Sequence, residues 1–182
     1  MTVFVAVEHG ECELRLCKYL SGWLRTEIVP VSRKNGAETI SLRESGEFLK
    51  QGPFKDLNAL NKYYREYRKG RVNRKLKMSE ITIFVIMDVD SDRASAKSFR
   101  SKDLFRDSPF YECIVPIMSD PDLDSVMKQA GFDIPERNKP KRYSEIFDSI
   151  ESADDMESLL QGKDTDIPRM IEIIKKHCQD FQ

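Results

Sequence analysis

The chain has 182 residues, 40% of them hydrophobic and 34% charged, so it is long enough to bury one core and short for two. Its 30 basic and 31 acidic side chains give a formal net charge of −1. This balance excludes attraction to nucleic acid by overall charge and requires segregated basic patches instead. The four cysteines lack CxxC spacing and only two histidines accompany them, which excludes a disulfide scaffold and a structural zinc site.

The N-terminal segment shows no sign of export or of membrane insertion. It has no basic n-region, and the carboxylate of Glu8 interrupts the apolar run that ends at Val7. No stretch of the chain approaches the ~20 apolar residues that cross a bilayer. We therefore expect a cytoplasmic protein that does not contact a membrane, in a reducing compartment.

A strand, a helix and a second strand are predicted at the start of the chain. Residues 3–7 form a short, continuously apolar run, which is typical of a strand buried on both faces. Between residues 14 and 24, apolar side chains recur at helical spacing. Residues 28–31 are a second strand candidate, and Pro30 favours an edge position or a strand end for it.

The middle of the chain is more polar. Residues 44–69 are expected to be helical, with an interruption near Gly52-Pro53, and residues 37–43 could extend the second strand or lead into this region. The clearest strand of the chain follows over 81–87 and is apolar on both faces. Residues 93–107 are charged, which favours a short helix and a loop.

The C-terminal part adds a strand and then helices. Residues 113–118 are the fourth strand candidate, a helix is expected near 141–150, and a last amphipathic helix is expected over 167–178. The acidic stretch 145–157 is interpreted as a solvated face or a partner contact. Strands that alternate with helices and are apolar on both faces predict an α/β fold with a mostly parallel four-stranded sheet flanked by helices.

Carboxylates follow three of the four predicted strands. They are Glu8; Asp88, Asp90 and Asp92; and Asp120, Asp122 and Asp124. Because the carboxyl ends of parallel neighbours meet at one edge of a sheet, we expect these acids to gather there. Clustered carboxylates repel one another without a cation, and Mg²⁺ binds carboxylate oxygens together with water and phosphate. Since soft ligands are lacking, the sequence predicts a magnesium site, with Mn²⁺ as the alternative.

The order of these motifs resembles the Toprim domain shared by bacterial primases, topoisomerases and several small nucleases. Residues 7–10 (VEHG) end a strand in glutamate with a glycine close behind, and residues 87–92 (MDVDSD) end a later strand in Asp-x-Asp. Within that group the chain is similar to the RloB-like and OLD-type nucleases of bacterial defence islands. In residues 119–124 (SDPDLD) a proline is followed after two residues by an acid, Asp124. The chain departs from the family pattern at His9, which separates glutamate from glycine, and at Asp124, where the family has glutamate.

The resemblance implies a Toprim-like domain over residues 1–150, with residues 151–182 as a short helical C-terminal extension packed on it. The implied activity is Mg²⁺-dependent cleavage of phosphodiester bonds in DNA or RNA, carried out by a toxic effector of antiphage defence. A Toprim domain of this size is also expected to need a partner protein or a homodimer to complete its substrate groove.

The same resemblance assigns roles to the acids. Asp88 and Asp90 are expected to bind Mg²⁺, and Glu8 is expected to act as a general acid/base or as a further metal ligand. Asp92 and Asp124 are candidates for a second ion. Taken singly, an acid after a first strand is an ordinary loop residue or helix cap, and aspartates are frequent at turns. Their joint occurrence in the Toprim order is what favours a site.

Substrate contacts are expected from basic side chains. Between residues 62 and 77 eight basic residues face the single acid Glu66, and tyrosines interleave with the arginines. Such a run is either a solvated helix face or a phosphate-binding surface, and its tyrosines either pack on the core or stack on bases. The predicted contacts are Arg65, Arg68, Lys69, Arg71, Arg74 and Lys75, with Lys139, Lys141 and Arg142 as phosphate clamps.

Two other functions fit parts of the pattern. Residues 88–91 (DVDS) partly match the nucleophile motif of haloacid-dehalogenase-like phosphatases, although the motif stands mid-chain and serine replaces the usual threonine. The departures at His9 and Asp124 fit a Toprim-like fold retained as a non-catalytic interaction or regulatory subunit. A phospho-aspartate trapped on Asp88 would identify the first, and metal-independent binding to a partner protein would identify the second.

Overall fold

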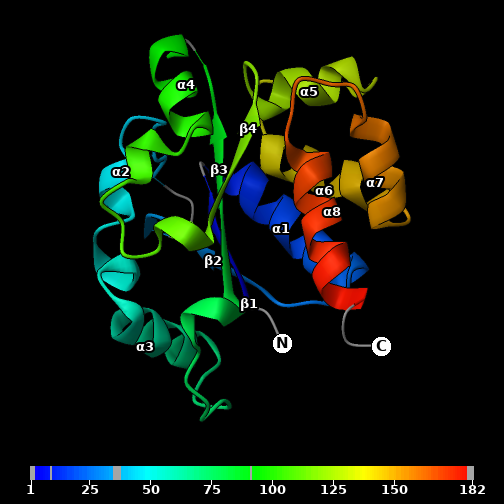
Figure 1. Cartoon of the computed structure of the whole chain (residues 1–182). Coiled ribbons are helices and arrows are strands. Elements are labelled where there is room, and N and C mark those ends of the chain that lie inside the picture. The colour runs from blue at the N-terminus through cyan, green and yellow to red at the C-terminus, as the bar shows by residue number, and fades with distance from the viewer. Residues whose placement is uncertain (1–2, 9, 35–37, 91, 180–182) are drawn as a thin grey trace.

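The structure, a computed structural model, describes residues 3–8, 10–34, 38–90 and 92–179, except for the side chains of Glu8 and Gln179. These residues form an all-parallel, four-stranded sheet in the order β2-β1-β3-β4, flanked by helices (Figure 1). The strands are β1 (Val3–Glu8), β2 (Ile28–Val31), β3 (Ile81–Asp88) and β4 (Ile114–Ser119). The sequence prediction of an α/β fold with a parallel sheet is confirmed, and Pro30 lies in an edge strand as expected.

Helices cover both faces of the sheet. The α-helices are α1 (Glu11–Trp23), α2 (Ser45–Phe48), α3 (Leu57–Tyr67), α4 (Arg93–Arg100), α5 (Leu123–Gln129), α6 (Lys139–Asp148), α7 (Ala153–Leu160) and α8 (Ile167–Gln179). The described residues also include the 3-10 turns η2 (Gly52–Phe54), η3 (Met78–Glu80), η4 (Asp103–Phe105) and η5 (Tyr111–Cys113). No helix in the described ranges is long and apolar enough to cross a membrane.

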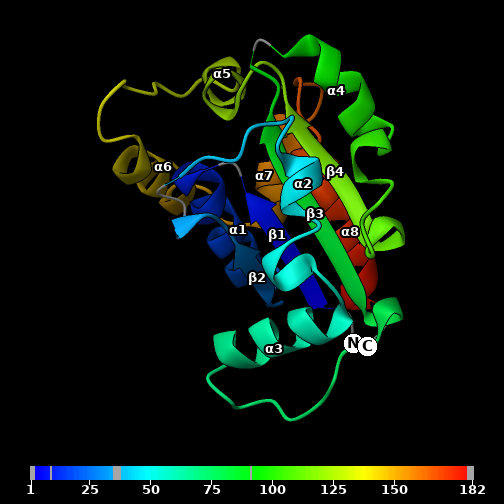
Figure 2. The ribbon, with the colours of Figure 1, turned by 90° about the vertical axis from the view of Figure 1, so that its left-hand side faces the viewer.

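The alternation of side chains along the strands divides the core into two layers. Val5 and Val85 belong to the layer under α2, α3 and α4, whereas Phe4 and Phe84 belong to the layer under α1 and α5 to α8 (Figures 1 and 2). The rings of Phe4 and Phe84 stack with centroids 5.7 Å apart. Met170 of α8 is fully buried in the second layer, so the C-terminal helices share the core of the sheet.

Helices α5 and α7 were not predicted individually. Both carry aspartate in the first turn, so their short apolar patterns are weak, and both have a side-chain cap at the N-terminus. The hydroxyl of Ser152 accepts the backbone N–H of Asp155 at 3.1 Å, and Met156 and Leu160, four residues apart, are buried under α7. The acidic stretch 145–157 is therefore partly a helix with an apolar underside.

The basic run 62–77 is helical only as far as Tyr67. Lys69 and Gly70 adopt left-handed φ values of 48° and 72°, a conformation that ends helices. Residues 71–77 then continue as an irregular loop to η3. The helix therefore ends close to the predicted limit at residue 69, and of the two alternatives for the run, a solvated helix face can apply only to its first half.

We expect Gly46→Ala to lower the free energy of unfolding by about 1–3 kcal/mol, because a Cβ there would overlap the backbone carbonyl oxygen of Leu104. Gly22 in α1 is the matched control, since nothing lies within 4 Å of the equivalent Cβ position. Gly22→Ala should be neutral or stabilise by up to about 1 kcal/mol. Urea denaturation of both variants measures the difference, and equal effects would contradict the close packing of α2 on η4.

Candidate functional site

An acidic hollow lies where β3 ends and where α1, α5 and α6 begin. It has a volume of about 270 Å³ and is lined mainly by first-turn residues of these helices. We call it the acidic hollow; its lining carboxylates are Glu11, Glu13, Asp88, Asp90, Asp122 and Asp124, and Lys139 adds a cation. The predicted gathering of strand-end acids at this edge therefore holds for Asp88, Asp90, Asp122 and Asp124.

Asp88 is the last residue of β3, and its carboxyl group is strongly perturbed by its surroundings. Its Oδ1 accepts the backbone N–H of Leu123 at 3.1 Å, which favours the ionised form. Burial and then the negative charge of Glu13 outweigh this bond and raise the pKa of Asp88 to about 8. Near neutral pH the carboxyl group therefore keeps a proton unless a cation enters the hollow.

Asp90 lies at the exposed mouth of the hollow in a left-handed conformation, with φ of 48°. This conformation is uncommon for residues other than glycine, although aspartate tolerates it better than most. The backbone N–H of Asp90 donates to the carbonyl of Pro121 at 2.7 Å, so the exit of β3 is tied to the turn after β4. Backbone strain of this kind concentrates at functional sites, where the surrounding structure holds it.

Asp124 already has two partners. The hydroxyl of Tyr143 donates to its Oδ1 at 2.9 Å, and the ammonium group of Lys139 donates to its Oδ2. Burial and the neighbouring charge of Asp124 raise the pKa of Tyr143, so the tyrosine remains a neutral donor. These two donors fix the orientation of Asp124, and a second ion bound there would have to compete with Lys139.

Glu13 was missed by sequence reasoning. It is 4% exposed and lies on the buried face of α1 with Leu16, Cys17 and Leu20, and its charge contributes to the shift at Asp88. The signal was available, because residues 13, 16, 17 and 20 share one face of a helix. A glutamate in that series is a buried carboxylate that needs a compensating partner or a functional reason.

The backbone of Glu8 ends β1 and is paired in register with Ile86, two residues before Asp88. The side chain of Glu8 and the whole of His9 lie outside the described residues. Glu8 therefore comes to the edge of the sheet that carries Asp88, as predicted from the strand order, and its role as acid/base or ligand stays a prediction.

Asp92 has a structural role outside the acidic hollow. Its carboxylate accepts the backbone N–H of Ser95 at 3.1 Å and thereby caps α4. Hydrogen bonds from the side chain and then from the backbone of Ser95 lower the pKa of Asp92. Arg43 lies 3.6 Å from its other oxygen. The two residues predicted to share a second ion, Asp92 and Asp124, thus have separate partners in different places.

The donor chemistry of the hollow fits a hard cation. Among the described side chains, no three His, Cys, Asp or Glu residues lie close enough to hold a metal ion by themselves. Mg²⁺ in phosphoryl-transfer sites needs fewer than three protein ligands of this kind, because it keeps several waters and uses one or two carboxylates together with substrate phosphate. The carboxylates of Asp88 and Asp90 supply such ligands, and the volume leaves room for water and a phosphate group.

Cys12 also lines the hollow, and its environment argues against nucleophilic catalysis. Burial and then the negative charge of Glu13 raise the pKa of the Cys12 thiol to about 12. Since the thiolate is the reactive form, this cysteine is an inert part of the wall.

The predicted nucleic-acid contacts of the run 62–77 lie at the opposite end of the sheet (Figure 2). Arg68 pairs with Glu27 at 2.7 Å and Arg74 pairs with Glu80 at 3.5 Å, and these acids immediately precede β2 and β3. The seven residue steps of β3 separate this end from Asp88 by roughly 23 Å at about 3.3 Å per residue. The structure therefore does not bring this basic run and the acidic hollow together.

The other predicted phosphate clamps lie at the start of α6. Lys139 lines the acidic hollow, whereas Arg142 pairs with Glu145 at 3.3 Å and donates to the carbonyl of Asp133 at 3.0 Å. Lys141 is exposed and also lies 3.9 Å from Glu145. Of these three cations, Lys139 is the one placed to meet a phosphate in the hollow.

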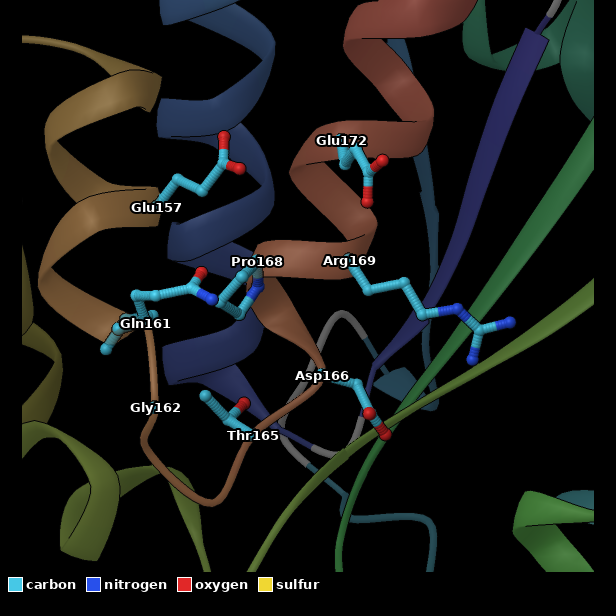
Figure 3. Close-up of a pocket in the computed structure, with 9 residues that line it drawn as sticks. Glu157, Gln161, Gly162, Thr165, Asp166, Pro168, Arg169 and Glu172 are labelled. Carbon is cyan, nitrogen blue, oxygen red and sulfur yellow. The ribbon is translucent and has the colours of Figure 1, made fainter.

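A second hollow, also of about 270 Å³, lies between the end of α7 and the start of α8 (Figure 3). Its polar groups form hydrogen bonds with the end of β4. The carboxylate of Asp166 accepts the backbone N–H of Met118 at 3.1 Å, and the hydroxyl groups of Thr165 and Ser119 are hydrogen-bonded at 3.1 Å. These bonds hold the end of β4 and so support the turn that leads to Asp124.

Comparisons with protein-family models, with curated proteins and with solved structures found no match to this chain. The chemistry of the acidic hollow is therefore inferred from its own residues.

Proposed function

We propose that the acidic hollow is a Mg²⁺-dependent phosphoryl-transfer site of the Toprim kind, which cleaves phosphodiester bonds of nucleic acid in the cytoplasm. The observation that supports this most is the state of Asp88. Its pKa is raised to about 8 by burial and by neighbouring acids at the carboxyl end of a parallel strand. A cation in the hollow would relieve this repulsion, and active sites are where such shifts concentrate.

In this proposal Asp88, Asp90 and Glu8 hold the ion. A bound Mg²⁺ would supply a Lewis acid for the phosphate and lower the pKa of a bound water. Lys139 and the N-terminal end of α1 face the same hollow and would attract the negative phosphate group. Tyr143, through its bond to Asp124, would keep the wall of the site in place.

We expect purified protein to cleave nucleic acid with Mg²⁺ or Mn²⁺, and to lose at least about 99% of that activity in EDTA, because removing the ion removes several kcal/mol of charge stabilisation. The substrates are plasmid DNA, oligonucleotides and tRNA. A phosphate monoester is included, because its hydrolysis with a trapped phospho-aspartate on Asp88 would identify a phosphatase instead. Folded protein that neither cuts nor binds either ion in calorimetry would favour a non-catalytic interaction subunit.

A further inference from the structure

The last turn of α3 and the loop after it carry an excess of positive charge, and we call this region the basic end. Its exposed cations without a carboxylate within ion-pair distance among the described residues are Arg65, Lys69, Arg71, Lys75 and Lys77. Elsewhere on the molecule, arginines and lysines often pair with acids, as Arg15 does with Glu11 at 2.8 Å. Uncompensated charge gathered on one segment creates a local positive potential that the net charge of −1 conceals.

The basic end is fastened at both sides. The side-chain amide of Asn61 donates to the carbonyl of Leu76 at 3.2 Å, and its oxygen accepts the backbone N–H of Leu76 at 2.6 Å. At the other side, the guanidinium group of Arg68 pairs with Glu27. The loop between these anchors projects beyond α3, away from α4 and α5 (Figures 1 and 2). The cations are therefore presented by a held loop and not by a loose tail.

An aromatic ring accompanies the charge. Tyr67, at the end of α3, is 43% exposed and is the most exposed large apolar side chain in the described ranges. Cations that follow a phosphate backbone, combined with an exposed ring on which a base can stack, are the usual means of binding single-stranded nucleic acid. An acidic protein partner would be attracted by the cations alone and would not require the exposed ring of Tyr67.

We infer that the basic end is a docking surface for single-stranded nucleic acid that is separate from the acidic hollow and needs no metal. The roughly 23 Å along β3 then sets a minimum length for a substrate that contacts both places. For a stacked strand, with about 3.4 Å of rise per nucleotide, this separation corresponds to roughly seven nucleotides, and an unstacked single strand spans it with fewer because it is longer per nucleotide. The length requirement rests on the proposed function, whereas the docking does not.

The test measures binding of a fluorescent 20-nucleotide oligo(dT) by anisotropy, in EDTA and over a series of salt concentrations. The variant combines Lys69→Glu, Arg71→Glu and Lys75→Glu. Its matched control combines Lys18→Glu, Lys97→Glu and Lys128→Glu, which reverse three exposed cations elsewhere. We expect at least a tenfold loss of affinity in the first variant and a salt slope smaller by about 2, since each lost phosphate contact contributes about 0.7. Tyr67→Ala should weaken binding about fivefold or more.

Equal binding by the two triple variants would overturn the inference, as would the absence of binding by the wild-type protein. Sedimentation of the wild type and of both triple variants tests for self-association. If the wild type and the control variant self-associate and the variant at the basic end does not, this surface binds a second copy of the chain instead. Binding in EDTA without any Mg²⁺-dependent cleavage would leave the docking surface standing and remove the proposed function. Melting curves confirm that both variants are folded.

Discussion

Asp88→Asn should reduce Mg²⁺-dependent cleavage about a thousandfold or more. Asparagine keeps the shape of the side chain and an oxygen that can accept the N–H of Leu123, so the turn into α5 is preserved. It removes the negative charge that would hold the ion at the centre of the acidic hollow. A metal contributes several kcal/mol of charge stabilisation, and about 4 kcal/mol corresponds to a factor of roughly a thousand in rate. Initial rates on the best substrate of the panel measure the effect.

The control for this variant is Asp133→Asn, which removes an exposed carboxylate outside the hollow. Its rate should stay within twofold of the wild type, because a solvated carboxylate that does not line the hollow contributes little to the site. An Asp88→Asn protein that retains more than a tenth of the wild-type rate would show that Asp88 is not the central ligand. Cleavage would then have to depend on other residues.

The strands were predictable because a parallel sheet covered on both faces requires continuous apolar runs. The segment at 3–7 is wholly apolar and the segment at 81–87 is apolar except for the β-branched Thr82, and the observed β1 and β3 each extend only one residue beyond them. Because the acids follow directly after the predicted strands, the sequence also indicated that they meet at the carboxyl ends of the strands. By contrast, α5 was hidden because its seven residues contain too few apolar positions for a helical period to be visible.

The site was predictable only in part. Asp88 and Asp90 follow directly from the strand end, but Asp92 has the same local pattern and is used as a helix cap. Glu13 required the helical face of α1 to be considered residue by residue. The end of the basic run at residue 77 precedes the strand 81–87, so the sequence already places it about one strand length from Asp88, but the position of the helical part of the run could not be predicted. It depends on the packing of α3, whose Tyr63 donates to the carbonyl of Pro30 at 2.7 Å.

In EDTA, Asp88→Asn should stabilise the folded protein, and the gain should grow as the pH rises. The pKa of Asp88 is about 8 in the folded state against an ordinary 3.8. Between these values the folded protein holds a proton that the unfolded chain has released, so wild-type stability falls with rising pH and levels off above about 8. A neutral amide avoids this loss. At pH 8 we expect the free energy of unfolding of the variant to exceed that of the wild type by about 2 kcal/mol. This is only a part of the free energy that corresponds to the full pKa shift, because neighbouring carboxylates share the proton.

For a chain of this size, that gain raises the melting temperature by about 4–8 °C. Near pH 4 the two proteins should melt together, since Asp88 is then protonated in the wild type as well. Mg²⁺ should reverse the order at pH 8, because it binds the wild-type hollow and stabilises it by about 2.7 kcal/mol at a hundredfold excess over its dissociation constant. The variant should not respond. If Mg²⁺ raised both melting temperatures equally, or if the variant were less stable at every pH, Asp88 would not be a destabilised carboxylate that binds the cation.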